Sequence, residues 1–356
     1  MEIKSAMDPT GFVTTGSVYT TEGIPTSTSV TDVLLPVLYF IIGFLGILGN
    51  GVVIIVFLAN RKVFRSITNL LILNQAIMDF VVAIIFLLDR FGPSLYKLTT
   101  NETLSEMLCR IWDSEYLLWA FYIASTQNLV MVSLERYFAT CHPVKHRNYF
   151  TIRGAKIGIA GIWLFGLVYQ SYWIFVFFFE FSSQSCFPLW TNRTLQACMG
   201  VFVFLMEYLI PLIVMTFSYV NIILMLKKRG QGKSGSVFQR AKRNVTITLC
   251  LVFVSYVICW TPTEFGYILY NCGRPYDFEG TFHYVATVLV LCNMCTAPFI
   301  YTFKYEQFQN YLKRMFFGRC LGVNRIDVNT VSAVPEPQDQ TLNRSSDTGK
   351  QAATTA

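Results

Sequence analysis

CRIWDSEYLLWAFYIASTQNLVMVSLERYFATCHP, residues 109–143, is the stretch that decides the fold of this protein. It begins with a cysteine, runs through a long apolar segment and ends in Glu135-Arg136-Tyr137 ahead of a basic loop. At about 100° per residue, Leu118, Ser125 and Arg136 fall on one helical face about 27 Å long. We therefore predict one helix that crosses a membrane from one aqueous surface to the other.

Arg136 is the most informative residue of this stretch. An arginine at the centre of a bilayer costs roughly 2.5–3.5 kcal/mol or more, so Arg136 is expected at the aqueous end of the helix, beside Glu135 and with a function. The alternative is an interfacial arginine that snorkels next to an acid at a helix end. The rest of the chain decides between the two.

The composition indicates a membrane protein. Of 356 residues, 53% are hydrophobic and only 14% are charged, which is too apolar for a soluble chain of this length. Seven apolar runs are long enough to span a bilayer as helices: residues 33–58, 67–88, 110–134, 155–179, 197–226, 245–270 and 282–303. We predict an all-α membrane protein, a bundle of seven transmembrane helices over residues 32–303, with the two chain ends on opposite sides.

Basic residues predict the orientation of the bundle. Lys and Arg are concentrated in the first, third and fifth loops, so the positive-inside rule places these loops and the C-terminus in the cytoplasm and the N-terminus outside. The basic residues of these loops are Arg61, Lys62, Arg65, Lys145, Arg147, Arg153, Lys227, Lys228, Arg229, Lys233, Arg240, Lys242 and Arg243. The net charge of +7 then faces acidic lipid headgroups or an acidic partner surface, and nothing indicates nucleic acid.

Two kinds of residue mark the loops assigned to the outside. Asn101 and Asn192 begin glycosylation sequons there, which agrees with the topology. Cys109 and Cys186 also fall in this oxidising compartment, so we predict a disulfide between them. Cys198 and Cys272 lie toward the same side, and the sequence leaves open whether they pair.

The segments on either side of the bundle are predicted from their composition. Residues 1–31 are polar and rich in Thr and Ser, without an apolar signal region, and are expected to form a disordered extracellular tail. Residues 304–320 alternate basic and apolar positions, as in a short amphipathic helix on the inner membrane surface. Cys320 at its end is either palmitoylated or a free thiol. Residues 321–356 are expected to be a disordered cytoplasmic tail with phosphorylation sites at Ser345, Ser346 and Thr348.

Polar residues and prolines stand out inside the predicted spans. Asp79 is expensive at membrane depth unless it meets partners or an ion, so it is a functional candidate. Gly49 beside Asn50 suggests close helix packing. The fifth, sixth and seventh spans contain Pro211, Pro262 and Pro298, which bend helices, so we expect these helices to move and the first four to be straight scaffold.

With these residues in place, the chain resembles the rhodopsin-like (class A) G-protein-coupled receptors over residues 33–320. The ordered marks that carry the resemblance are Gly49-Asn50, Asp79, Cys109, Glu135-Arg136-Tyr137, Trp163, Pro211, Cys259-Trp260-Thr-Pro262, and Pro298 with Tyr301. The resemblance implies a plasma-membrane receptor that activates a heterotrimeric G protein and whose phosphorylated tail binds arrestin.

The resemblance also implies roles for particular residues. Glu135, Arg136 and Tyr137 would meet the G protein when the sixth helix swings outward, and Tyr219 and Tyr301 would turn inward to hold the active state. Trp260 would lie under the ligand pocket and act with Pro262 and Pro298 as an activation switch. The residues Asn50, Asp79, Ser125 and Asn293 would form a polar centre that binds sodium in many members.

Three departures from the family pattern have consequences. Ala297 stands where asparagine is usual, which removes an amide from the polar centre and puts sodium binding in doubt. Glu135 replaces the commoner aspartate and keeps the charge. The interval from Cys109 to Arg136 is two residues longer than usual, so the outer part of the third helix must bulge or the disulfide must lie higher.

The pocket positions favour a cationic ligand. Leu118 and Leu291 lie where amine receptors carry aspartate and opsins carry the retinal lysine, so neither ligand class fits. Glu207 and Glu264 instead project into the outer half of the bundle and would pair with a cation; Asp89, Asp113 and Glu115 lie nearer the mouth. We predict a basic or amidated neuropeptide, as in invertebrate-type peptide receptors. The alternative is that Glu264 is simply protonated or bonded to Tyr267.

Two other classes of membrane protein remain open from the sequence. A seven-helix transporter would use Asp79, Glu207 and Glu264 along an ion path, but no inverted repeat or broken-helix pair is evident. A scavenger that binds ligand without signalling is given some weight by Ala297. No catalytic constellation and no metal-ligand spacing indicates an enzyme.

Overall fold

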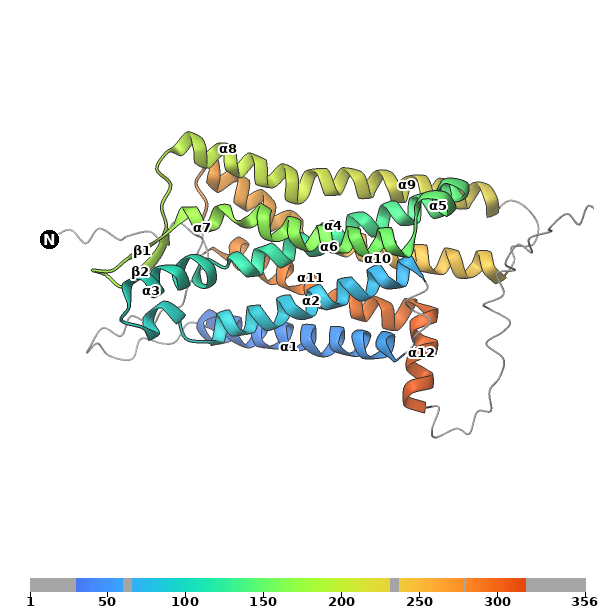
Figure 1. Cartoon of the computed structure of the whole chain (residues 1–356), viewed down its shortest axis with the longest axis horizontal. Helices are drawn as coiled ribbons and strands as arrows, with labels where there is room; N and C mark the ends of the chain where they lie inside the picture. Colours follow the sequence, from blue (N-terminus) through green and yellow to red (C-terminus); the bar gives the residue numbers. More distant parts are fainter. Residues whose placement is uncertain (1–29, 60–65, 231–236, 278–279, 318–356) are drawn as a thin grey trace, which may run out of the picture.

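The computed structural model describes residues 30–59, 66–230, 237–277 and 280–317. Seven of its helical segments are long and apolar enough to cross a membrane, and they lie side by side along the long axis of the molecule (Figure 1). The long helices are α1 (Val30–Leu58), α2 (Ile67–Phe91), α4 (Tyr116–Cys141), α6 (Ile152–Gln170), α9 (Ile210–Gly230), α10 (Val237–Asn271) and α11 (Thr281–Lys304). The predicted seven-helix bundle is confirmed.

Short elements cap the two ends of the bundle. At one end, termed the disulfide end, lie a 3-10 turn (Leu95–Leu98), α3 (Glu102–Leu108), α7 (Tyr172–Val176), β1 (Phe177–Glu180), β2 (Ser185–Pro188) and the start of α8 (Arg193–Val203). At the other, termed the Arg136 end, α5 (Pro143–Tyr149) follows α4, and α12 (Glu306–Phe317) lies crosswise to the long helices (Figure 1). The amphipathic helix predicted after the seventh span is therefore present over its described part.

Helices dominate because lipid offers no hydrogen bonds to the backbone, so each spanning segment must satisfy its own amide and carbonyl groups. The helices differ in how deeply they are packed. In the most hydrophobic part of α2, 67% of residues are buried, compared with 11% in the segment formed by α6 and α7. The α2 helix therefore belongs to the core, and most of α6 faces the surroundings.

Two prolines each leave a backbone carbonyl that another helix satisfies. Pro298 has no N–H for the Met294 carbonyl one turn earlier, and Asn50 Nδ2 of α1 donates to that carbonyl at 2.7 Å. A Cβ on Gly49 would lie 3.0 Å from the Pro298 ring, so glycine lets α1 approach closely enough for this bond. The packing role predicted for Gly49-Asn50 thus has a definite partner, the bend in α11.

The second case lies in the fifth span. Pro211 cannot donate to the carbonyl of Glu207, and Tyr256 of α10 donates its hydroxyl to that carbonyl at 3.0 Å. The chain from Phe204 to Leu209 forms a π-helical segment between α8 and α9. Such bulges are frequent at functional sites, and this one carries Glu207.

The third span is not one unbroken helix, so that prediction is wrong. Residues Cys109–Asp113 form a π-helical turn, and Glu115 then has a left-handed backbone (φ 57°) that separates the turn from α4. The outer part of this span thus bulges, which is one of the two alternatives stated for the longer interval from Cys109 to Arg136. Among the first four spans, α1 contains a proline, Pro36, inside its first two turns.

The loop after α6 forms an antiparallel hairpin of β1 and β2, which was not predicted. Cys186 on β2 is disulfide-bonded to Cys109, as predicted, so the hairpin is fixed to the outer end of the third span. Cys198 and Cys272 are both free and exposed, which answers the question left open by the sequence. Cys320, the predicted tail 321–356 and residues 1–29 of the predicted tail 1–31 lie outside the described residues. Val30 and Thr31 begin α1, so the tail prediction is two residues too long.

Candidate functional site

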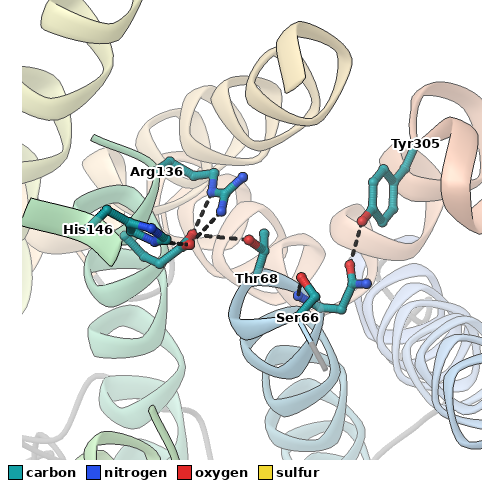
Figure 2. A network of polar contacts seen from close by, with 7 residues as sticks. Ser66, Thr68, Arg136, His146 and Tyr305 are labelled. Carbon is teal, nitrogen blue, oxygen red and sulfur yellow. Dashed lines mark hydrogen bonds and ion pairs between the residues drawn. The ribbon is translucent and has the colours of Figure 1, made fainter. Parts of the chain in front are cut away.

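A cluster of charged and polar groups surrounds Glu135 at the Arg136 end. Figure 2 shows Arg136, His146 and Thr68 converging on one carboxylate, which belongs to Glu135. Arg136 binds it through Nε and Nη2, both at 2.5 Å, His146 Nε2 lies at 2.9 Å, and the Thr68 hydroxyl donates at 3.1 Å. Glu135 is 1% exposed, so its charge depends on these partners.

The same end joins α2 to the start of α12. Ser66 caps α2 by accepting from the Asn69 amide at 3.5 Å, and Tyr305 donates its hydroxyl to Asn69 Oδ1 at 2.6 Å (Figure 2). Burial raises the pKa of the Tyr305 phenol, so it remains a hydrogen-bond donor at neutral pH. The cluster therefore links α2, α4, α5 and the α11–α12 junction.

The three tyrosines predicted to couple to a G protein occupy different environments. Tyr137 contacts His142 through its hydroxyl at 3.1 Å and packs on Phe217. Tyr219 and Tyr301 are buried inside the bundle. Neither of them hydrogen-bonds to Arg136 in the described parts of the chain, so Arg136 is held by Glu135 alone among these residues.

A polar layer crosses the middle of the bundle around Asp79. Ser125 donates to Asp79 Oδ1 at 2.8 Å, and Gln75 Nε2 lies 3.0 and 3.2 Å from the two carboxylate oxygens. Gln75 Nε2 also contacts the Ser125 hydroxyl, while its Oε1 accepts from Asn128 at 2.8 Å. Asn74 extends the layer to Asn128 and accepts from Trp163 at 3.0 Å.

This layer differs from the predicted polar centre. Asp79 and Ser125 are together as expected, but Asn50 bonds to backbone carbonyls of α1 and α11, and Asn293 makes no hydrogen bond to Asp79 within the described chain. Gln75 was missed. Its signal was a polar residue one helical turn before Asp79, on the same helix face.

A cavity of about 110 Å³ lies inside the disulfide end of the bundle. Four of its lining residues are acids, Asp113, Glu115, Glu207 and Glu264, and none of the described residues that line it is Lys, Arg or His. The other lining residues are Ser114, Trp119, Gln170, Tyr172, Trp173, Phe177, Cys186, Val203, Thr263 and Tyr267. Such a site favours a cationic group with an apolar or aromatic surface.

The two deep acids are held differently. Glu207 Oε1 accepts from Gln170 Nε2 at 2.9 Å. Glu264 is 4% exposed, and its Oε2 has no hydrogen-bond partner in the described chain. The bond to Tyr267 considered as an alternative is not formed. An unpaired buried carboxylate oxygen is costly, which makes Glu264 the cavity's most demanding acceptor.

Glu115 is already paired at the cavity's outer edge. Its Oε1 lies 2.6 Å from Arg90 Nη2, and its Oε2 accepts from Trp119 at 3.1 Å. Asp89 lies 3.7 Å from Arg90 and does not line the cavity. Arg90 is thus an internal counterion for Asp89 and Glu115, and the sequence did not indicate this pairing.

Leu118 and Trp260 are buried and are not among the described residues that line the cavity. Leu118 is 2% exposed and packs in the core. The Trp260 ring meets Tyr122 edge-on at 5.5 Å, and its indole N–H has no acceptor among the described residues. Trp260 lies on α10 two residues before Pro262 and one helical turn before Glu264; its place under a ligand pocket stays a prediction.

The sequence comparisons agree with this geometry. Residues 49–301 match the model of the 7 transmembrane receptor (rhodopsin family), and the chain belongs to that family. It is therefore a multi-pass membrane receptor of the G-protein-coupled class and not an enzyme.

Individual relatives share less than a third of their residues with this chain. Galanin receptor 2b of Danio rerio is 29% identical over 320 residues, which cover 85% of this chain and 81% of the relative. The allatostatin-A receptor of Bombyx mori is 27% identical over 297 residues, 80% of each chain. Cysteinyl leukotriene receptor 2 of Mus musculus is 29% identical over 294 residues, 79% of this chain and 90% of the relative.

Proposed function

We propose that this receptor binds a basic or amidated neuropeptide at its disulfide end and activates a heterotrimeric G protein at its Arg136 end. The observation that carries the proposal is Glu264, a buried acid with an unpartnered oxygen in a cavity lined by four acids. Two relatives named for peptides, galanin and allatostatin-A, support the same ligand class.

The size of the cavity suggests how a peptide would bind. A space of about 110 Å³ holds one side chain or a chain terminus but not a whole peptide. A peptide would therefore insert one cationic group among the acids, where pairing offsets the desolvation of both charges. The remainder would lie against the hairpin, which supplies Phe177 and Cys186 to the cavity wall.

The proposed orientation places the N-terminus and the disulfide end outside the cell. Basic residues of the Arg136 end, among them Lys145, Arg147, Lys227 and Lys228, would then face the cytoplasm. Acidic lipids and, after phosphorylation of the tail, arrestin are further partners proposed for this side.

The proposed mechanism is a shift between two populations. In the described conformation Arg136 is bound to Glu135. A ligand that binds Glu207 and Glu264 acts on the fifth and sixth spans, where Pro211, Trp260 and Pro262 lie. Rearrangement there would favour a state in which Arg136 leaves Glu135 and meets the G protein.

A peptide-library screen tests this function. Cells expressing the chain with a promiscuous G protein are expected to respond to basic or amidated peptides, and Arg136→Ala is expected to abolish the response while ligand binding remains. Binding without nucleotide exchange on any G protein would indicate a scavenger and contradict the proposal. A response to leukotriene-like compounds but to no peptide would contradict the proposed ligand class.

A further inference from the structure

We infer that the cation taken by the deep cavity is a planar guanidinium, as in an arginine side chain, and not a compact ammonium. This inference rests on the proposed function and specifies the chemistry of its ligand. It is carried by the number, position and orientation of the acceptors that line the cavity.

The first observation is that two of the residues lining the cavity each carry a buried oxygen without a hydrogen-bond partner in the described chain. Glu264 Oε2 on α10 and Gln170 Oε1 at the end of α6 are both buried, and neither has a hydrogen-bond partner in the described chain. Both residues line the same cavity together with Glu207. A ligand that satisfies this site must therefore donate in several directions at once.

The second observation concerns the amide of Gln170. Its nitrogen donates to Glu207 Oε1 at 2.9 Å. The carbonyl Oε1 is then left as an acceptor for a further donor. Gln170 is 1% exposed, so packing holds it in this orientation.

These acceptors suit a guanidinium better than an ammonium. A guanidinium carries five N–H donors in a rigid plane, so one group can serve acceptors on the sixth, fifth and fourth spans together. An ammonium is a smaller and more strongly hydrated charge with three donors, and it gives up more hydration on entering.

The walls of the cavity favour the same choice. Trp119, Tyr172, Trp173 and Tyr267 line it beside the acids. A flat guanidinium stacks on aromatic faces while its edge donates hydrogen bonds. The cavity thus combines a polar edge for the N–H groups with aromatic surface for the plane.

Thermal unfolding of the purified full chain with two small probes tests the inference. n-Butylguanidinium is expected to raise the midpoint temperature at a concentration about tenfold or more below that needed for n-butylammonium, the factor given by one added charge-assisted hydrogen bond. Glu264→Gln should remove this stabilisation, and Gln170→Leu should reduce the preference between the probes.

Glu180→Gln is the matched control, because Glu180 lies at the end of β1 outside the cavity lining and should leave both responses unchanged. Equal stabilisation by both probes, stabilisation by neither, or an undiminished response in Glu264→Gln would overturn the inference. The proposed function would survive that result if a lysine peptide activated a G protein. If n-butylguanidinium bound but no peptide caused nucleotide exchange, the proposed function would fail while the guanidinium preference of the cavity would stand.

Discussion

Gln75 shows how one side chain can settle the fate of a buried acid. Its amide nitrogen faces both oxygens of Asp79 and the Ser125 hydroxyl. A cation bound to Asp79 and Ser125 would need that same position. The amide therefore acts as a neutral internal substitute for an ion, and this agrees with the doubt that Ala297 raises about sodium binding.

Replacing Gln75 tests this arrangement. Gln75→Leu is expected to lower the free energy of unfolding by about 1–3 kcal/mol, because Asp79 and Asn128 each lose a buried hydrogen-bond partner. Replacing choline chloride in the buffer with sodium chloride should leave the unfolding midpoint of the wild type unchanged and raise that of the variant. A sodium-dependent midpoint in the wild type would contradict the assignment. Thermal unfolding of the purified proteins measures both effects.

Glu115 offers a second test at the scale of single residues. Glu115→Gln is expected to destabilise the protein by about 3 kcal/mol, because Arg90 would remain buried after losing the carboxylate 2.6 Å away. In the double variant Arg90→Gln, Glu115→Gln the pair is removed together and only Asp89, 3.7 Å from Arg90, loses its partner, so part of the stability should return. Additive losses in denaturant unfolding would show that the two residues are not coupled.

Individual residues were predictable from sequence where a helical face or a cost at membrane depth singled them out. Arg136 and Asp79 were found in this way, and each has a buried hydrogen-bond partner, Glu135 and Ser125 respectively. The partners themselves were not predictable. Gln170 and Glu207 lie 37 positions apart, and only the packing of their two spans brings them together.

Elements were predictable where hydrophobic length decided them and unpredictable where backbone geometry did. Apolar runs predicted all seven spans, and most of the predicted ends lie within a few residues of the observed ends. The break at Glu115 depends on one residue with a left-handed backbone, which no periodicity reveals. The β1–β2 hairpin has strands of four residues, too short for alternation to identify.

A contact between α10 and α12 restrains the sixth span at the Arg136 end. Asn244 of α10 donates to Glu306 Oε1 at 3.1 Å and accepts from the Glu306 amide at 3.5 Å. One turn later, Thr248 donates to the carbonyl of Lys304 at 3.3 Å. Asn244 thus satisfies an amide that the first turn of α12 cannot bond internally.

Breaking this contact is expected to free the end of α10. Glu306→Ala should raise basal nucleotide exchange by about fivefold, the effect of one hydrogen bond with a net value of about 1 kcal/mol. Glu306→Gln keeps a side-chain acceptor for Asn244 and serves as the control. Spin labels on α4 and α10 at the Arg136 end would report the same shift as longer distances. Equal basal activity in the wild type and both variants would refute the restraint.

At the scale of the whole molecule, charge divides between the two ends. The cavity at the disulfide end is lined by acids, whereas the described basic residues of the Arg136 end include Lys145, Arg147, Arg153, Lys156, Lys227, Lys228 and Lys304. Such a division orients a membrane protein during insertion and fixes which end meets the cytoplasm.

Glycosylation checks this orientation. Asn101 and Asn192 are exposed helix caps at the disulfide end, and each uses Oδ1 for the cap, whereas a glycan would be attached at Nδ2. Asn101→Gln and Asn192→Gln are each expected to remove one glycan, seen as a mass loss on gels before but not after glycosidase treatment. Asn244→Gln, in a sequon at the Arg136 end, should leave the mass on gels unchanged. Loss of a glycan in the Asn244→Gln variant alone would show that the Arg136 end faces outward and contradict the proposed orientation.

In the π-helical segment, one residue, Glu207, contacts both the cavity and the neighbouring span. The side chain of Glu207 faces the cavity, while its own carbonyl is held by Tyr256 of α10. A ligand that displaces this carboxylate therefore also displaces the backbone to which Tyr256 of α10 is bonded, and no other side chain is needed to couple the two spans. Substitutions between the two spans should therefore weaken signal transmission less than a change at Tyr256 itself.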